Sequence, residues 1–207
     1  MKILLNLMKS ILTILKTNKH IKTLQNINTM KLHLAVAKDN LRPHLQYIQI
    51  KGGFVYATNC HILARIPVNE IFGEQFTNED EFYILGEDWK KQKFYKLTDF
   101  KKNGNLLEGY DHKWNLEGIV KMKTREEMDN IGRFPDCENV IYSSEQPLVA
   151  LSQIGFNPSL LMDLAEALGE DMGRLVLNFY GTIKTIQVKP KNSKKLGILM
   201  PIDISIA

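Results

Sequence analysis

The sequence has few of the residues that build disulfide, metal or phosphate sites. Its two cysteines, Cys60 and Cys137, form no CxxC pair and have no spacing typical of zinc ligands. This sparse usage favours a reduced, cytoplasmic compartment. Glycines are scattered, and the pair at residues 52–53 is too short for a phosphate-binding loop. We therefore expect neither a metal nor another cofactor.

Long apolar runs are also missing. No stretch reaches the roughly 18 apolar residues of a membrane span, so we expect no membrane partner. Apolar residues at positions 4, 5, 8, 11, 12 and 15 follow a helical period, and lysines occupy the other side. Residues 1–29 are thus predicted to be an amphipathic N-terminal extension, followed by a domain over 30–207. Docking of this extension on a membrane surface is the open alternative.

An excess of one charge sign is lacking as well. The formal net charge is +4, from 27 basic and 23 acidic side chains, which is mild for a dedicated nucleic-acid binder. With 44% hydrophobic and 24% charged residues, the composition is that of an ordinary folded domain. A chain of 207 residues has room for one principal core.

The sequence contains no convincing catalytic constellation. Cys60 and His61 are adjacent, and on a strand they would point to opposite faces, so we expect a buried cysteine, an exposed histidine and no nucleophile–base pair. The other candidate acids and bases have no recognisable spacing: Asp39, Asp111, His112, Asp136 and Glu138. We predict a protein that is not an enzyme, with no catalytic or metal-ligating residue.

Alternating apolar residues predict a chain rich in strands. The predicted strands cover 31–36, 45–50, 54–58, 61–68, 82–85, 106–110, 116–122, 175–179, 183–188 and 196–202. A short helix is expected over 87–93 and a longer one after Asn157, which caps it, with Pro158 at its first position and Gly169 at its end. Residues 123–130 are expected to be a polar link.

This order of elements predicts an α+β fold of antiparallel sheets with a few short helices on one face. A strand and helix pattern recurs near 31–72, 79–142 and 148–204, which suggests three half-repeats.

Four segments, in this order, resemble the DNA polymerase III beta subunit, the bacterial sliding clamp. Residues 54–64 (FVYATNCHILA) are similar to the family's A-T-D-G-H-R-L-A strand pair, and 132–141 (GRFPDCENVI) to its G-R-F-P-D-Y segment. Residues 154–161 (IGFNPSLL) resemble the I-G-F-N start of a helix in the last domain of the family. Residues 199–202 (LMPI) resemble the closing V-M-P-M. The resemblance implies a DNA-clamp-like fold.

The chain also departs from the family. A clamp subunit has six half-repeats, whereas this chain has room for about three, so it is shortened relative to a full clamp. Asn59 and Cys60 replace the usual Asp-Gly. Clamp subunits close into a ring around DNA, and these departures put the formation of such a ring by this chain in doubt.

The resemblance implies a face for double-stranded DNA, because clamp helices meet phosphates without reading sequence. Lys90, Lys91, Lys93 and Arg42 are the residues we assign to this contact. A merely solvated lysine face is an equal alternative. The acidic positions of the last helix argue against DNA contact: Asp163, Glu166, Glu170 and Asp171. A second basic cluster, over 189–195, is expected to be a solvated loop.

Clamps also hold short peptides of replication or repair proteins in an apolar groove. Here that partner pocket would comprise Ile62, Leu63, Met200, Pro201 and Ile202, unless these residues are ordinary sheet core. The resemblance thus implies a non-catalytic DNA-binding, processivity or scaffolding protein of replication or repair, which self-associates. The alternative is a clamp-derived interaction module that no longer binds DNA.

Overall fold

The computed structural model describes residues 30–143, 146–170, 175–191 and 193–203. The predicted extension over 1–29 lies outside the described residues. Seven strands form one antiparallel sheet in the order β4-β1-β2-β3-β10-β9-β8. Their bounds are β1 Tyr47–Lys51, β2 Phe54–Thr58, β3 Ile62–Pro67, β4 Phe82–Leu85, β8 Leu175–Asn178, β9 Ile186–Pro190 and β10 Leu196–Leu199.

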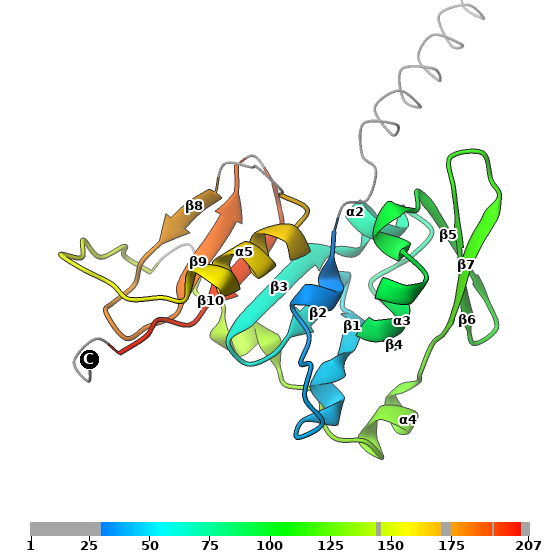
Figure 1. The fold of residues 1–207 in the computed structure, drawn as a ribbon, viewed down its shortest axis with the longest axis horizontal. Helices are drawn as coiled ribbons and strands as arrows, with labels where there is room; N and C mark the ends of the chain where they lie inside the picture. Colours follow the sequence, from blue (N-terminus) through cyan, green and yellow to red (C-terminus); the bar gives the residue numbers. More distant parts are fainter. Residues whose placement is uncertain (1–29, 144–145, 171–174, 192, 204–207) are drawn as a thin grey trace, which may run out of the picture.

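A second, three-stranded sheet lies at the end of the molecule opposite β8 (Figure 1). It has the order β5-β6-β7, with bounds β5 Asp99–Asn103, β6 Leu106–Tyr110 and β7 Leu116–Lys121. The α-helices are α2 Val68–Phe72, α3 Gly86–Lys91, α4 Arg125–Asp129 and α5 Pro158–Ala167. The 3-10 helices are η1 Leu32–Leu34, η2 Pro43–Gln46, η3 Phe94–Lys96 and η4 Cys137–Val140. The predicted class, antiparallel sheets with a few short helices, is confirmed.

The β1–β2 hairpin forms as its sequence predicts. Gly52 and Gly53 both adopt positive φ, which residues with a Cβ rarely tolerate, and the strands pair from Gln49 opposite Tyr56. Helix α5 also begins as predicted, because the Asn157 side chain accepts a hydrogen bond from the Ser159 amide.

The two faces of the seven-stranded sheet have separate cores. On one face, strand residues such as Ile48 and Ile66 pack with helices α2, α3 and α5, around the fully buried Trp89. Gly197 of β10 lies directly under Leu164 of α5, so that helix sits close to the sheet. On the other face a smaller cluster includes Tyr56, Leu63, Tyr83, Met128 and Phe134. Residues 125–140 cover this second face.

The predicted strand over 31–36 is wrong. The segment is the 3-10 helix η1, closed by the Leu34 amide donating to the carbonyl of Lys31. Its buried residues are Leu32, Ala35 and Val36, which is a helical spacing, although the apolar residues Leu32, Leu34 and Val36 also follow the alternation of a strand. A segment this short satisfies both periods, and packing against α3 and α5 decides between them.

Three other local predictions differ from the structure. The expected polar link over 123–130 contains α4, which begins with a capping box between Thr124 and Glu127. Strand β5 was not predicted, since its residues 101–103 are polar. Strand β10 ends at Leu199, and Ile202 makes only an isolated bridge with Gly155.

Candidate nucleic-acid interface

Helices α3 and α5 lie on the same side of the molecule, with η1 between them (Figure 1). We call the surface of these three elements, together with Lys31 and Lys38 that flank η1, the helical face. Apolar residues anchor each element: Leu32 of η1, Trp89 of α3, and Leu164 with Leu168 at the end of α5 are fully buried. The polar side chains of the same elements are therefore left on the outside.

Lysines of the helical face neutralise most of its carboxylates. Lys31 Nζ lies 2.6 Å from Glu166 Oε2, and the Lys31 amide donates to the Glu166 carbonyl. Lys38 Nζ lies 3.9 Å from Asp163 Oδ2. Two of the four acidic positions that argued against DNA contact, Asp163 and Glu166, thus have lysine partners from the segment around η1. The prediction missed this pairing because it placed residues 31–36 in a strand.

The lysines predicted to contact DNA lie on or just after α3. Lys91 pairs with Glu87 at 2.9 Å, one helical turn away. Lys90 is exposed and, among the residues that the structure describes, has no carboxylate within ion-pair distance. Lys93 is exposed in a left-handed conformation before η3. Arg42 immediately precedes η2, which begins at Pro43.

His33 lies half-buried in the middle of the helical face. Its ring is 5.5 Å from the ring of Tyr95, and its Nδ1 atom is buried without a hydrogen-bond partner in the described structure. Burial, and then the positive charges of Lys90, Lys31 and Lys38, lower the pKa of His33 from 6.5 to about 4, although Glu166 acts in the opposite sense. His33 is therefore a neutral part of this surface at physiological pH.

We expect His33 to make stability depend on pH. Its pKa is lower in the folded chain, so the unfolded chain binds more protons between about pH 4 and pH 6.5. The stabilisation is complete above pH 6.5 and is lost as the pH falls towards about 4. Urea unfolding at several pH values should show that the free energy of unfolding falls less on acidification for His33→Gln than for the wild type. His61 is exposed, so His61→Gln is the matched control. An equal fall in the free energy of unfolding on acidification in all three proteins would refute this role of His33.

The basic loop between β9 and β10 lies at the C-terminal end of α5. Lys195 Nζ donates a hydrogen bond to the Leu168 carbonyl at 2.8 Å. This carbonyl at the C-terminal end of the helix has no donor within the helix itself. A shallow hollow of about 510 Å³ adjoins it, lined by Asn69, Glu70, Glu170, Lys191, Ser193, Lys194 and Lys195. Burial raises the pKa of Glu70, while Lys195 and Lys194 act to lower it. This loop has a structural role at the helix end.

The predicted partner-pocket residues are only partly brought together. Ile62 and Leu63 are neighbours on β3, and they are buried in the cores on opposite faces of the sheet. The Met200 amide donates to the carbonyl of His61, so the end of β10 does lie beside the start of β3. Met200 and Ile202 are 40% and 51% exposed. Apolar surface is thus present at this place.

No family model matches the sequence, and no curated protein is significantly similar to it. Solved structures do match. The sliding clamp of Bacillus subtilis covers 87% of this chain with a TM-score of 0.58 and 13% sequence identity. A DNA polymerase III beta subunit of Thermotoga maritima covers 88% with a TM-score of 0.55 and 15% identity. A putative beta subunit of Eubacterium rectale covers 88% with a TM-score of 0.59 and 10% identity.

The chain has the fold of the bacterial sliding clamps. It spans less than two thirds of the length of these clamps, between 62% and 64%. Identities of 10–15% show the clamp fold alone.

The four segments that resemble sliding clamps occupy connected places in this clamp fold. Residues 54–64 are β2, its turn and the start of β3. Residues 199–202 begin at the last residue of β10, which pairs with β3, and continue beyond that strand. Residues 132–141 cross the second face of the same sheet, ending in η4. Residues 154–161 open α5, and Gly155 bridges to Ile202. The resemblance therefore concerns one contiguous region of the fold.

The Cys60–His61 pair lies in the turn between β2 and β3. Cys60 is exposed with φ of 73°, so the expected buried cysteine is wrong. His61 is exposed, as expected. The described ranges contain no group of three or more His, Cys, Asp or Glu side chains arranged to hold a metal ion. Nor does any helix in the described part of the chain combine the length and hydropathy of a membrane span.

Proposed function

We propose that this chain is a non-catalytic, sliding-clamp-like protein that binds double-stranded DNA without reading its sequence. It would serve as a processivity or scaffolding component of replication or repair. The observation that carries the proposal is the clamp fold with Lys90 and Lys91 exposed on its helical face. Lysine contacts to phosphates are independent of sequence, which is what a sliding protein needs.

The helical face supports modest rather than tight DNA binding. Three of its lysines, Lys31, Lys38 and Lys91, are already paired with carboxylates. A phosphate must compete with those carboxylates, whereas Lys90 is available directly. Of the predicted contacts Lys90, Lys91, Lys93 and Arg42, Lys91 is expected to contribute less than Lys90, because it is paired with Glu87. We also propose that several copies assemble, since one shortened chain cannot surround a duplex.

Fluorescence anisotropy with two duplexes of unrelated sequence tests the proposal. Both should bind with the same affinity, and the logarithm of the binding constant should fall linearly with the logarithm of salt concentration. Absence of binding at low salt would overturn the DNA role. The clamp-derived interaction module would then be preferred, because apolar Met200 and Ile202 remain exposed beside β3 for a short peptide of a partner.

A further inference from the structure

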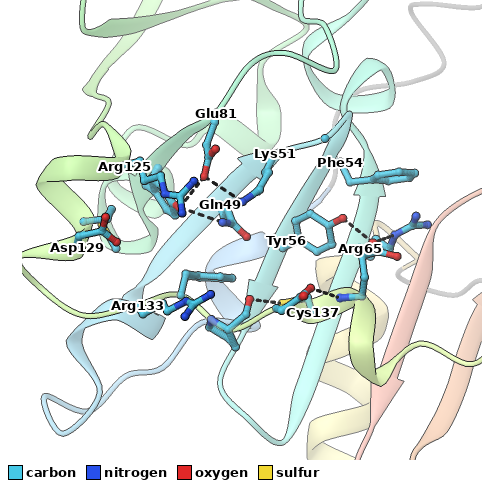
Figure 2. A pocket seen from close by; sticks show the side chains of 17 residues that line it. Gln49, Lys51, Phe54, Tyr56, Arg65, Glu81, Arg125, Asp129, Arg133 and Cys137 are labelled. Carbon is cyan, nitrogen blue, oxygen red and sulfur yellow. Dashed lines mark hydrogen bonds and ion pairs between the residues drawn. The ribbon is translucent and has the colours of Figure 1, made fainter.

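Charge is balanced over the part of the chain that follows residue 29. In the groove of about 460 Å³ between α4 and strands β1 to β4, four cationic side chains, among them Arg125 and Arg133, face the same space as four acidic ones (Figure 2). Residues 30–207 together contain 22 basic and 23 acidic side chains. Residues 1–29 contain five lysines and no aspartate or glutamate, so the positive net charge of the protein belongs to this extension.

The first 17 residues have the sequence pattern of an amphipathic helix. With about 3.6 residues per turn, all seven polar side chains would fall within about one third of the helical circumference: positions 2, 6, 9, 10, 13, 16 and 17. The other ten residues are apolar and share the remaining arc. Lys2, Lys9 and Lys16 are seven positions apart, which aligns them along the polar arc. The pattern ends there, because Asn18 and Lys19 would fall on the apolar arc.

A membrane surface that contains anionic lipids fits both arcs of this pattern. Acyl chains bury the apolar arc, and anionic headgroups attract the lysines. Duplex DNA would attract the lysines but leave the apolar arc in water. The chain's own domain could bury the apolar arc, but its 22 basic and 23 acidic side chains give the lysines almost no net attraction. Lysines at every seventh position also favour a helix that lies on the surface over one that spans the bilayer.

The extension joins the domain at a fixed point on the helical face. Met30 is 6% exposed, and its carbonyl accepts a hydrogen bond from Nε1 of Trp89 in α3 at 3.3 Å. The Lys31 amide donates to the Glu166 carbonyl of α5 at 3.1 Å. The twelve residues over 18–29 can span at most about 40 Å from this point. The domain therefore need not touch a surface to which residues 1–17 bind.

We propose that residues 1–17 bind the surface of a membrane that contains anionic lipids, as a helix lying along that surface, and thereby recruit the clamp-like domain to it. The apolar arc supplies the burial, and the lysines supply the preference for anionic lipid. This membrane contact is separate from the DNA contact, which involves lysines of the helical face.

Vesicle flotation of the full chain tests the membrane contact. One set of vesicles contains phosphatidylcholine alone, and the other contains phosphatidylcholine with phosphatidylglycerol as the anionic lipid. The chain should bind the anionic vesicles at least about tenfold more tightly, and added salt should reduce this preference. Far-ultraviolet circular dichroism should show additional helix when the anionic vesicles are present.

Substitutions on the two arcs locate the contact. Ile11→Gln with Leu15→Gln places two polar side chains in the middle of the apolar arc and should weaken binding to anionic vesicles by at least about tenfold. Ser10→Gln with Thr13→Gln makes two changes on the polar arc without altering the charge, and it should keep the wild-type affinity.

A second pair of variants separates the lysines of the extension from overall charge. Lys9→Gln with Lys16→Gln should weaken binding to anionic vesicles by at least about tenfold and leave any binding to phosphatidylcholine unchanged. Lys101→Gln with Lys113→Gln removes the same charge from the three-stranded sheet and should keep the wild-type affinity.

Three results with vesicles would each overturn the proposal: equal binding to both vesicle types, equal losses in the two arc variants, or no binding up to about 1 mM lipid. A lower free energy of urea unfolding for Ile11→Gln with Leu15→Gln would also overturn it, because the apolar arc would then cover the chain's own domain. Duplex affinity of this variant should equal that of the wild type. A loss of duplex affinity with unchanged vesicle binding would overturn the proposal and assign the extension to DNA.

Discussion

Replacing Trp89 by alanine should lower the free energy of unfolding by about 3 to 5 kcal/mol, the largest single effect on stability expected in this chain. Trp89 is 0% exposed and packs edge-on against Phe72 and Phe94 and in stacked orientation against Phe100, at centroid distances of 5.4–6.2 Å. Its indole Nε1 donates to the Met30 carbonyl at 3.3 Å. The substitution therefore opens a cavity and leaves that carbonyl without this donor.

The second tryptophan provides a matched control. Trp114 is 65% exposed and contacts chiefly the Tyr110 ring at 5.9 Å. Trp114→Ala should cost less than about 1 kcal/mol. Urea unfolding followed by far-ultraviolet circular dichroism measures both variants without relying on tryptophan emission. Similar losses in the two variants would show that the aromatic core around α3 is not packed as described.

Reversing charge at Lys38 and Lys90 should produce the largest functional effect. The double variant Lys38→Glu, Lys90→Glu would remove two of the proposed phosphate contacts, and it leaves Asp163 without its lysine. We expect the slope of log binding constant against log salt to fall in magnitude by about 2, and low-salt affinity to fall at least about tenfold. Anisotropy titrations at several salt concentrations give both quantities.

The control for charge reversal is a pair of lysines off the helical face. Lys101 and Lys113 are exposed on the three-stranded sheet, and changing both to Glu alters the net charge equally. That variant should keep the wild-type salt slope. If both double variants lose affinity to the same extent, overall charge rather than the helical face governs DNA binding.

Local signals in the sequence predicted much of the fold. The glycine pair of the β1–β2 hairpin and the Asn157–Pro158 start of α5 each depend on the chemistry of a few adjacent residues, and both predictions are confirmed. The clamp-like segments were recognisable for the same reason, since each is a short local motif. The proposed half-repeats near 31–72, 79–142 and 148–204 stay a prediction.

The candidate sites depended on contacts between distant residues, which the sequence does not display. Residues 31–36 fit two periods, and only packing against α3 and α5 makes them helical. The pairing of Lys31 with Glu166 spans 135 positions, so the neutralisation of Glu166 was not predictable from local sequence. The groove beside Arg125 and Arg133 likewise exists because the 125–140 segment folds back over β1 to β4.

The state of assembly in solution, with and without duplex DNA, tests a clamp role most directly. Sedimentation velocity should show a species larger than the 23.8 kDa single chain, which forms or persists on duplex DNA and separates from it as salt rises. A stable monomer that does not co-sediment with duplex DNA at low salt would contradict the clamp role.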